Sequence, residues 1–184
     1  MKIMANAIKV VTGKARFSFC NVWAPKSING GDPKYSVSII IVKSDKETIA
    51  KIKAATEEAK KDGIAKFGAK FTSGAGFKTP LRDGDIDRAD DENYANCYFI
   101  NANSTTAPGV IDRDKQAILD STEVYSGCYG RASITFYPFN VNGNRGVACG
   151  LQNLQKLADG EPLGGGRSRA EDDFDDFEDD DFLS

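Results

Sequence analysis

The chain has 184 residues, 40% of them hydrophobic, which predicts one domain of ordinary size with a real core. It has no histidine, so the usual general base and metal ligand is missing, and Ser–His and Cys–His nucleophile pairs are excluded. The net charge of −3 is segregated, because residues 1–169 hold all 24 Lys and Arg against 18 acids, whereas residues 170–184 hold nine acids and no base.

Strand patterns open the chain. Residues 7–23 mix β-branched and aromatic residues around Gly13, and residues 16–19 alternate polar with aromatic at the period of a strand, which predicts one or two strands. Residues 24–33 collect Pro, Gly, Asn and Asp, which suit a turn. Residues 34–43 (KYSVSIIIVK) predict the next strand.

One helix is expected after these strands. Ser44 or Asp45 can cap its start, and apolar residues recur at helical spacing through Lys61. Gly63 is its expected end. Residues 68–94 combine glycines with an acid-rich stretch and show no sustained period, which predicts a long functional loop.

The remainder of the body returns to strand patterns. Residues 97–103, 128–139 and 145–154 predict three strands, and Asn142-Gly143 suits a hairpin turn between the last two. Glycines at several strand bends favour a strongly curved barrel over a flat sheet. The expected fold class is therefore mainly β with one or two helices: an OB-fold, which is a small, partly open β-barrel.

The expected domain organisation has three parts. Residues 1–159 form an OB-fold nucleic-acid-binding domain, residues 160–169 a glycine-rich linker, and residues 170–184 a disordered acidic tail that is too charged to build a core. Repeated phenylalanines among the carboxylates favour a tail that binds partner proteins, although a plain solubility tail is the alternative. The expected partner-binding residues are Asp172, Asp173, Phe174, Asp175, Asp176, Phe177, Asp179, Asp180, Asp181 and Phe182.

The expected cellular compartment depends on the cysteines and on the absence of long apolar runs. The four cysteines are far apart and form no CxxC pair, and the first ten residues lack the apolar run of a secretory signal. No segment approaches the roughly 18 consecutive apolar residues of a membrane-spanning helix. We therefore expect a cytoplasmic protein without a membrane partner.

Aromatic and basic residues alternate through the cationic body. Exposed rings stack on unpaired bases while cations hold the phosphates, so this combination predicts single-stranded nucleic-acid binding. Burial in the core is the competing interpretation for any one ring, so the prediction depends on the set. The candidate nucleic-acid-binding residues are Trp23, Lys34, Tyr35, Phe77, Lys78, Arg82, Phe99, Tyr129, Arg131, Tyr137 and Arg145.

Strand alternation refines this set at one place. Tyr129, Arg131 and Ser133 share one strand face, which is expected to point to solvent or ligand, while Cys128 and Gly130 lie on the other. A basic loop over residues 66–82, with glycines that give it conformational freedom, is a further candidate for closing over a nucleic-acid backbone.

Catalytic and metal sites are not expected. Asp83, Asp85 and Asp87 resemble the start of a calcium loop, but Arg88 replaces the required glycine and Tyr94 the closing glutamate. No cofactor is expected either. Two alternatives stay open: a metal-dependent nuclease that uses the carboxylates between Asp83 and Glu92, and an interaction protein that does not touch nucleic acid.

Five segments carry a resemblance to a known family. They are Leu81–Asp85 (LRDGD), Tyr98–Ser104 (YFINANS), Ser126–Tyr129 (SGCY), Gly150–Lys156 (GLQNLQK) and Asp159–Gly165 (DGEPLGG). The chain resembles, over nearly its whole length, a family of phage and prophage single-stranded-DNA-binding proteins long catalogued as a domain of unknown function. Members of that family combine an OB-fold core with an acidic C-terminal tail.

The resemblance implies a function. It implies largely sequence-independent binding of single-stranded DNA in phage DNA replication, recombination or repair, without enzymatic activity. It further implies that the tail contacts phage or host replication and recombination proteins and occupies the DNA groove when DNA is absent. The expected location is the cytoplasm of an infected or lysogenic bacterial host, and a homodimer is left open.

Overall fold

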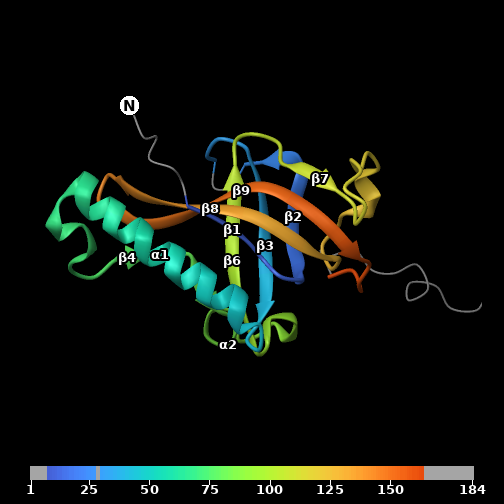
Figure 1. The fold of residues 1–184 in the computed structure, drawn as a ribbon, viewed down its shortest axis with the longest axis horizontal. Coiled ribbons are helices and arrows are strands. Elements are labelled where there is room, and N and C mark those ends of the chain that lie inside the picture. The colour runs from blue at the N-terminus through green and yellow to red at the C-terminus, as the bar shows by residue number, and fades with distance from the viewer. Residues whose placement is uncertain (1–7, 28–29, 164–184) are drawn as a thin grey trace, which may run out of the picture.

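A computed structural model describes residues 8–27 and 30–163. Within this part, nine strands, two α-helices and three short 3-10 helices follow one another (Figure 1). They are β1 (Ile8–Val11), β2 (Ala15–Lys26), β3 (Lys34–Val42), α1 (Lys46–Phe67), η1 (Ala69–Thr72), β4 (Phe77–Lys78), β5 (Leu81–Asp83), α2 (Gly84–Asp87), η2 (Glu92–Tyr94), β6 (Cys97–Ser104), β7 (Gly109–Ile111), η3 (Ser121–Glu123), β8 (Tyr129–Val141) and β9 (Asn144–Ala158). The predicted acidic tail and all but residues 160–163 of the predicted linker lie outside the described residues.

Five of the strands close into a ring. β2 pairs antiparallel with β3, β3 with β6, and β8 with both β9 and β2, while β6 and β9 run parallel. The ring closes where Ala15 lies opposite Gly130 and Asn103 opposite Gly150. This arrangement is the five-stranded barrel of the OB-fold, so the predicted fold class is confirmed.

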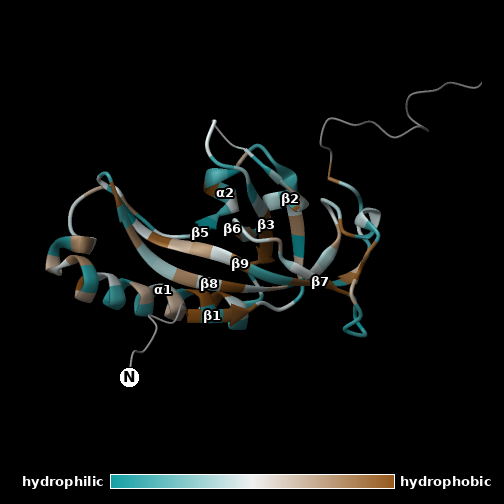
Figure 2. Ribbon diagram, turned by 90° about the horizontal axis from the view of Figure 1, so that it is seen from above, coloured by the Kyte–Doolittle hydropathy of each residue, from teal (hydrophilic) through white to brown (hydrophobic). Residues whose placement is uncertain are grey.

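Alternating side chains of these strands fill the barrel. Val37, Ile39 and Ile41 of β3 point inward and are at most 1% exposed. α1 packs its apolar face, including Ile52, against β8 and β1. In Figure 2, α1 and β1 lie on one side of the β8–β9 hairpin and α2 lies on the other. One outer face of the barrel is therefore free of the long helix.

The boundaries of α1 explain one wrong prediction. Asp45 caps the helix by accepting a hydrogen bond from the Thr48 backbone N at 3.2 Å, as expected. The helix does not stop at Gly63, because it continues to Phe67. Gly63 is instead a packing position: a Cβ there would overlap the ring of Phe71 from η1. A glycine inside the helix thus lets η1 pack closely against it.

Of two further sequence patterns, the long loop is not found and the hairpin turn is confirmed. The segment over residues 68–94 is not one long loop, because it contains η1, β4, β5, α2 and η2, each of only two to four residues. The β8–β9 hairpin turns at Asn142 (φ 50°) and Gly143 (φ 84°), as the Asn-Gly pair predicts. No helix in residues 8–27 and 30–163 has the length and apolar character needed to cross a membrane.

Candidate nucleic-acid interface

A groove of about 390 Å³ lies on the outer face of β2, β3 and β6. Side chains that alternate with the buried ones of β3 form its floor, where Ser36 lies opposite Asn103 and Ser38 opposite Asn101. Its further lining residues are Phe19, Asn21, Lys26, Lys34 and Arg88. In the OB-fold this strand face commonly binds oligonucleotides. The groove therefore combines amides, cations and an aromatic ring on a surface suited to a nucleic-acid strand.

An irregularity in β2 turns one aromatic ring into this groove. The pairing of β2 with β3 loses register between Ser18 and Asn21, and Phe19 adopts φ 46°. Such a bulge re-aims the side chains that follow it. Phe17, two residues earlier, is fully buried, whereas Phe19 is 58% exposed. The bulge thus exposes a ring that regular alternation would have placed on the face of Phe17.

Two cations stand side by side at the mouth of the groove. Lys26 of β2 and Lys34 of β3 are directly opposite each other in the ladder, and both are exposed. Like charges in opposite positions destabilise a strand pair. In the part of the chain that the structure describes, neither amine forms an ion pair with a carboxylate. Binding of an anion between them would relieve this repulsion.

A small apolar cluster bounds the groove at its other end. Ile40, Tyr94, Cys97 and Phe99 form it, with the rings of Tyr94 and Phe99 edge to face at 5.1 Å. The Tyr94 hydroxyl donates to Ser38 Oγ at 3.2 Å. Phe99 is 0% exposed, so its assignment as a base-stacking residue is wrong. η2 covers the outer face of β6 at that position and encloses the ring.

A second pocket, of about 320 Å³, lies beyond this cluster on the same outer face. Tyr129 is half-buried there, with Lys14 Nζ 5.0 Å and the Arg16 guanidinium carbon 5.4 Å from its ring centroid. Arg16 also donates to the carbonyls of Gly127 at 3.1 Å and Glu161 at 2.7 Å. Neutral carbonyls leave its positive charge uncompensated. This pocket is a cation–π cluster with net positive charge.

The acid-rich segment does not assemble a metal site. Lys43 Nζ contacts Asp83 at 2.9 Å and Asp85 at 2.7 Å, and Arg82 contacts Asp87 at 3.2 Å. The Lys43 ammonium, with the Asn96 backbone N–H, holds the pKa of the Asp85 carboxyl below its usual range. Among residues 8–27 and 30–163, no three His, Cys, Asp or Glu residues converge as metal ligands.

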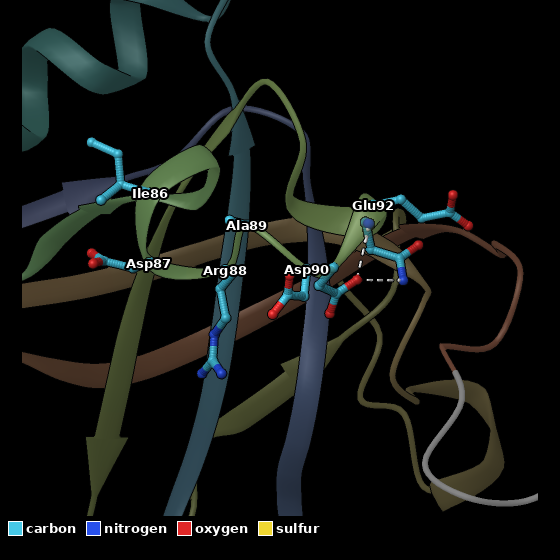
Figure 3. A pocket seen from close by; sticks show the side chains of 8 residues that line it. Ile86, Asp87, Arg88, Ala89, Asp90 and Glu92 are labelled. Atoms are coloured by element: carbon cyan, nitrogen blue, oxygen red, sulfur yellow. Dashed lines mark hydrogen bonds between the residues drawn. The ribbon is translucent and has the colours of Figure 1, made fainter.

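Figure 3 shows the rest of this segment at close range. The side chains of Arg88 and Asp90 are drawn next to each other, and the Asp91 carboxylate accepts two hydrogen bonds from Asn93 at 3.0 Å. Most of the segment's carboxylates are therefore committed to local ion pairs and turns.

The thiols are equally unsuited to nucleophilic chemistry. Burial raises the pKa of the Cys20 thiol to about 12 and lifts the pKa of Cys97, Cys128 and Cys149 above the usual range. The reactive thiolate form is therefore scarce at neutral pH. All four cysteines are free.

Three of the predicted binding residues have structural partners instead. The Trp23 ring packs against the core and its Nε1 donates to the Val124 carbonyl at 3.1 Å. Phe77 packs edge to face on Phe71 at 5.2 Å. Arg145 Nε donates to the Phe71 carbonyl at 2.7 Å, which ties η1 to β9. The Phe77 and Arg145 contacts, with the pairing of β4 on β9, hold the predicted basic loop against the β8–β9 hairpin.

The remaining predicted residues are dispersed. Lys34 lines the groove and Tyr129 the second pocket, so the structure brings these two onto one face. Tyr35 is half-buried opposite Ser104, and Arg82 is engaged with Asp87. The last three candidates, Lys78, Arg131 and Tyr137, are exposed outside both pockets and stay predictions.

Sequence reasoning missed several lining residues. Lys14 and Arg16 flank Ala15 at strand spacing, so the alternation that was used for Tyr129 could have found them. Phe19 and Arg88 carried no comparable signal, because a bulge exposes the first and the fold of the acidic segment positions the second.

A closed OB barrel whose outer strand face gathers cations, amides and an exposed ring defines a nucleic-acid-binding protein. The family model described as Enterobacter phage Enc34, ssDNA-binding protein, matches residues 8–183. The chain therefore belongs to this family of single-stranded-DNA-binding proteins, and the resemblance drawn from the sequence is confirmed.

Individual relatives and solved structures are similar to nearly the whole chain. Putative protein p50 of Acyrthosiphon pisum secondary endosymbiont phage 1 is 29% identical over 176 residues, covering 92% of this chain and 94% of the relative. The single-stranded-DNA-binding protein from bacteriophage Enc34, solved in complex with ssDNA, superimposes with TM-score 0.76 at 24% identity over 89% of this chain and 97% of that chain.

A more distant neighbour is gp2.5, a single-stranded-DNA-binding protein encoded by bacteriophage T7. Its TM-score is 0.62 at 13% identity, over 92% of this chain and 96% of that chain. The family is one of single-stranded-DNA-binding proteins rather than enzymes, so the chain is a single-stranded-DNA-binding protein.

Proposed function

We propose that this chain binds single-stranded DNA along the outer face of β2, β3 and β6, largely without base preference, in phage DNA replication, recombination or repair. The observation that carries the placement is the Lys26–Lys34 pair at the mouth of the groove. Phosphate is the anion that a DNA strand supplies at regular intervals, and binding it releases counterions.

The groove itself supports binding without sequence preference. Asn101 and Asn103 each offer both a donor and an acceptor, so they accommodate the edge of any base. Asn21 offers its Oδ1 as an acceptor, while its Nδ2 donates to the Phe19 carbonyl and to Ser36 Oγ. From the groove, the strand continues over the apolar cluster to the pocket of Tyr129, where Lys14 and Arg16 provide the next positive charges. The two pockets together form one cationic path across the barrel.

The acidic tail is the second part of the proposal. The last described residues run along this same face: the Leu163 backbone N donates to the Ser126 carbonyl at 2.9 Å, and its side chain packs on the apolar cluster. The tail is thereby tethered beside the cationic path, at high effective concentration. We propose that it competes with DNA for the path and, once displaced, recruits phage or host replication and recombination proteins.

The setting follows from this role. The protein acts in the cytoplasm of an infected or lysogenic bacterial host, where unpaired phage DNA is produced. A homodimer is compatible with the proposal, but neither the groove nor the Tyr129 pocket requires a second copy.

A titration with fluorescein-labelled oligothymidylate tests the placement. The double charge reversal Lys26→Glu and Lys34→Glu should weaken binding by roughly 100-fold at moderate salt and reduce the salt slope by about 1.4, the value for two single-strand phosphate contacts. Reversal of Lys51 and Lys61, which are exposed on α1, is the matched control with the same change in net charge. Equal losses in both variants would show that only net charge matters.

A further inference from the structure

We infer that Phe19 and Arg88 form a stacking site for one unpaired base, with Arg88 also binding the phosphate of that nucleotide. This inference rests on the proposed function, because it assigns two residues to a strand in the groove. It adds the position at which a base is held, whereas the lysine pair only places the backbone. The site joins β2 to the segment after α2, two parts of the chain that are far apart in sequence.

The first observation is the conformation of Phe19. Its φ of 46° lies in the left-handed region, which a bulky side chain rarely adopts and which Gly or Asn adopts more readily. The ring gains little packing in return, because 58% of the residue is exposed. A strained backbone that displays a large ring in a groove points to a function of the ring itself. An unpaired base is the flat apolar partner that such a ring accepts.

The second observation is the state of Arg88. Its guanidinium carbon lies 5.6 Å from the ring centroids of Phe19 and Tyr94 and 5.5 Å from that of Phe99. Within residues 8–27 and 30–163, the guanidinium forms neither a hydrogen bond nor an ion pair, and Nε is buried without a partner. Among the described residues, only aromatic rings position the Arg88 guanidinium, so its N–H groups are free to donate to a ligand.

The two observations combine into one geometry. Arg88 covers one face of the Phe19 ring and leaves the exposed face to a base, so the base, ring and guanidinium form a stack. The phosphate of the same nucleotide is the acceptor for the guanidinium donors, since an arginine fork matches phosphate oxygens. Lys26 and Lys34 then hold adjacent phosphates at the mouth of the groove.

The decisive variant is Phe19→Gly, because it separates binding from folding. Glycine relieves the strained φ, so the melting temperature should stay the same or rise. Loss of one base–ring stack should weaken binding to oligothymidylate by about 5- to 100-fold, with the salt slope unchanged. Phe19→Trp should retain binding. Leu119→Gly, at an exposed apolar residue outside the groove, is the control and should leave the affinity unchanged.

Arg88→Gln tests the second residue. It should weaken binding and reduce the salt slope by about 0.7, the value for one phosphate contact with a single strand. Unchanged affinity in Phe19→Gly would overturn the inference, and an unchanged slope in Arg88→Gln would overturn its phosphate part. If the Lys26 and Lys34 reversal still weakens binding in that case, the proposed function stands without the stacking site. If that reversal also fails, the placement of DNA in the groove is wrong.

Discussion

The two ends of the cationic path hold their aromatic rings in opposite ways. At one end, Tyr129 is half-buried at the start of β8, where the pairing with β9 shifts register, and Lys14 and Arg16 both lie within 5.4 Å of its ring centroid. At the other end, Phe19 projects from a bulge and is 58% exposed, with one guanidinium beside it. A ring that already has two cations has little surface left for a base. The difference suggests a division of labour in which the Tyr129 end attracts phosphate and the Phe19 end stacks a base.

The largest expected effect comes from the cluster between the two ends. Phe99→Ala leaves a cavity under η2, because the ring is fully buried against Tyr94 and Ile40. We expect a loss of about 3–5 kcal/mol in the free energy of unfolding, measured by urea denaturation. Oligonucleotide affinity per folded molecule should change less than in Phe19→Gly. A stable Phe99→Ala variant that has lost only its DNA affinity would contradict the assignment of Phe99 to the core.

Removal of the tail affects both ends together. Truncation after Gly166 deletes nine acids with only two bases, Arg167 and Arg169. Binding to oligothymidylate should tighten roughly tenfold at low ionic strength, because a tethered competitor is lost. The gain should disappear near 1 M salt, where the Debye length is about 3 Å. Weaker binding of the truncated chain at low salt would refute tail competition.

Substitution at Lys14 isolates the Tyr129 end. Lys14→Gln removes one exposed cation without touching the hydrogen bonds of Arg16. Affinity should fall only a few-fold and the salt slope by about 0.7, because one phosphate contact is lost. Phe19→Gly should show the reverse pattern, with a larger loss of affinity and no change of slope. If the salt dependence of binding had the same slope in both variants, the proposed difference between the two ends would be wrong.

The smallest effect concerns the ion pair that supports the Phe19 end. Asp85→Asn weakens the attachment of α2 to Lys43, so the melting temperature at neutral pH should drop slightly. The folded-state pKa of Asp85 is lowered, so its stabilisation is present above about pH 3.9 and is lost as the pH falls through that lower pKa. Melting curves of variant and parent should therefore converge in acid. A difference that persists at low pH would indicate a cause other than this charge.

Regular parts of the molecule were predictable from the sequence. Three features follow from local conformational preferences that the tertiary contacts also favour. They are the alternation in β3, the helix cap at Asp45 and the Asn142-Gly143 turn. Even the outward direction of Tyr129 follows from the period of its strand.

The missed features depend on contacts between distant segments. Phe99 has the spacing of an exposed residue, yet η2 folds over it. Gly63 looks like a helix stop, yet Phe71 packs against it. The bulge reverses the expected direction of Phe19, because one extra residue in a strand changes the face of all that follow. Arg88 lies in the groove only because of the way in which the acidic segment folds, and the local sequence does not predict that fold.

The ring of strands also constrains how the protein is made. Its closure pairs Ala15 with Gly130 and Asn103 with Gly150, and the first of these pairs spans more than half of the chain, so long-range contacts must form before the barrel exists. Such a topology folds slowly, on the scale of milliseconds to seconds. A ribosome-bound chain that lacks β9 already has the strands that line the groove, but it lacks the strand that closes the barrel behind them. We therefore expect a rigid groove only when synthesis is nearly finished.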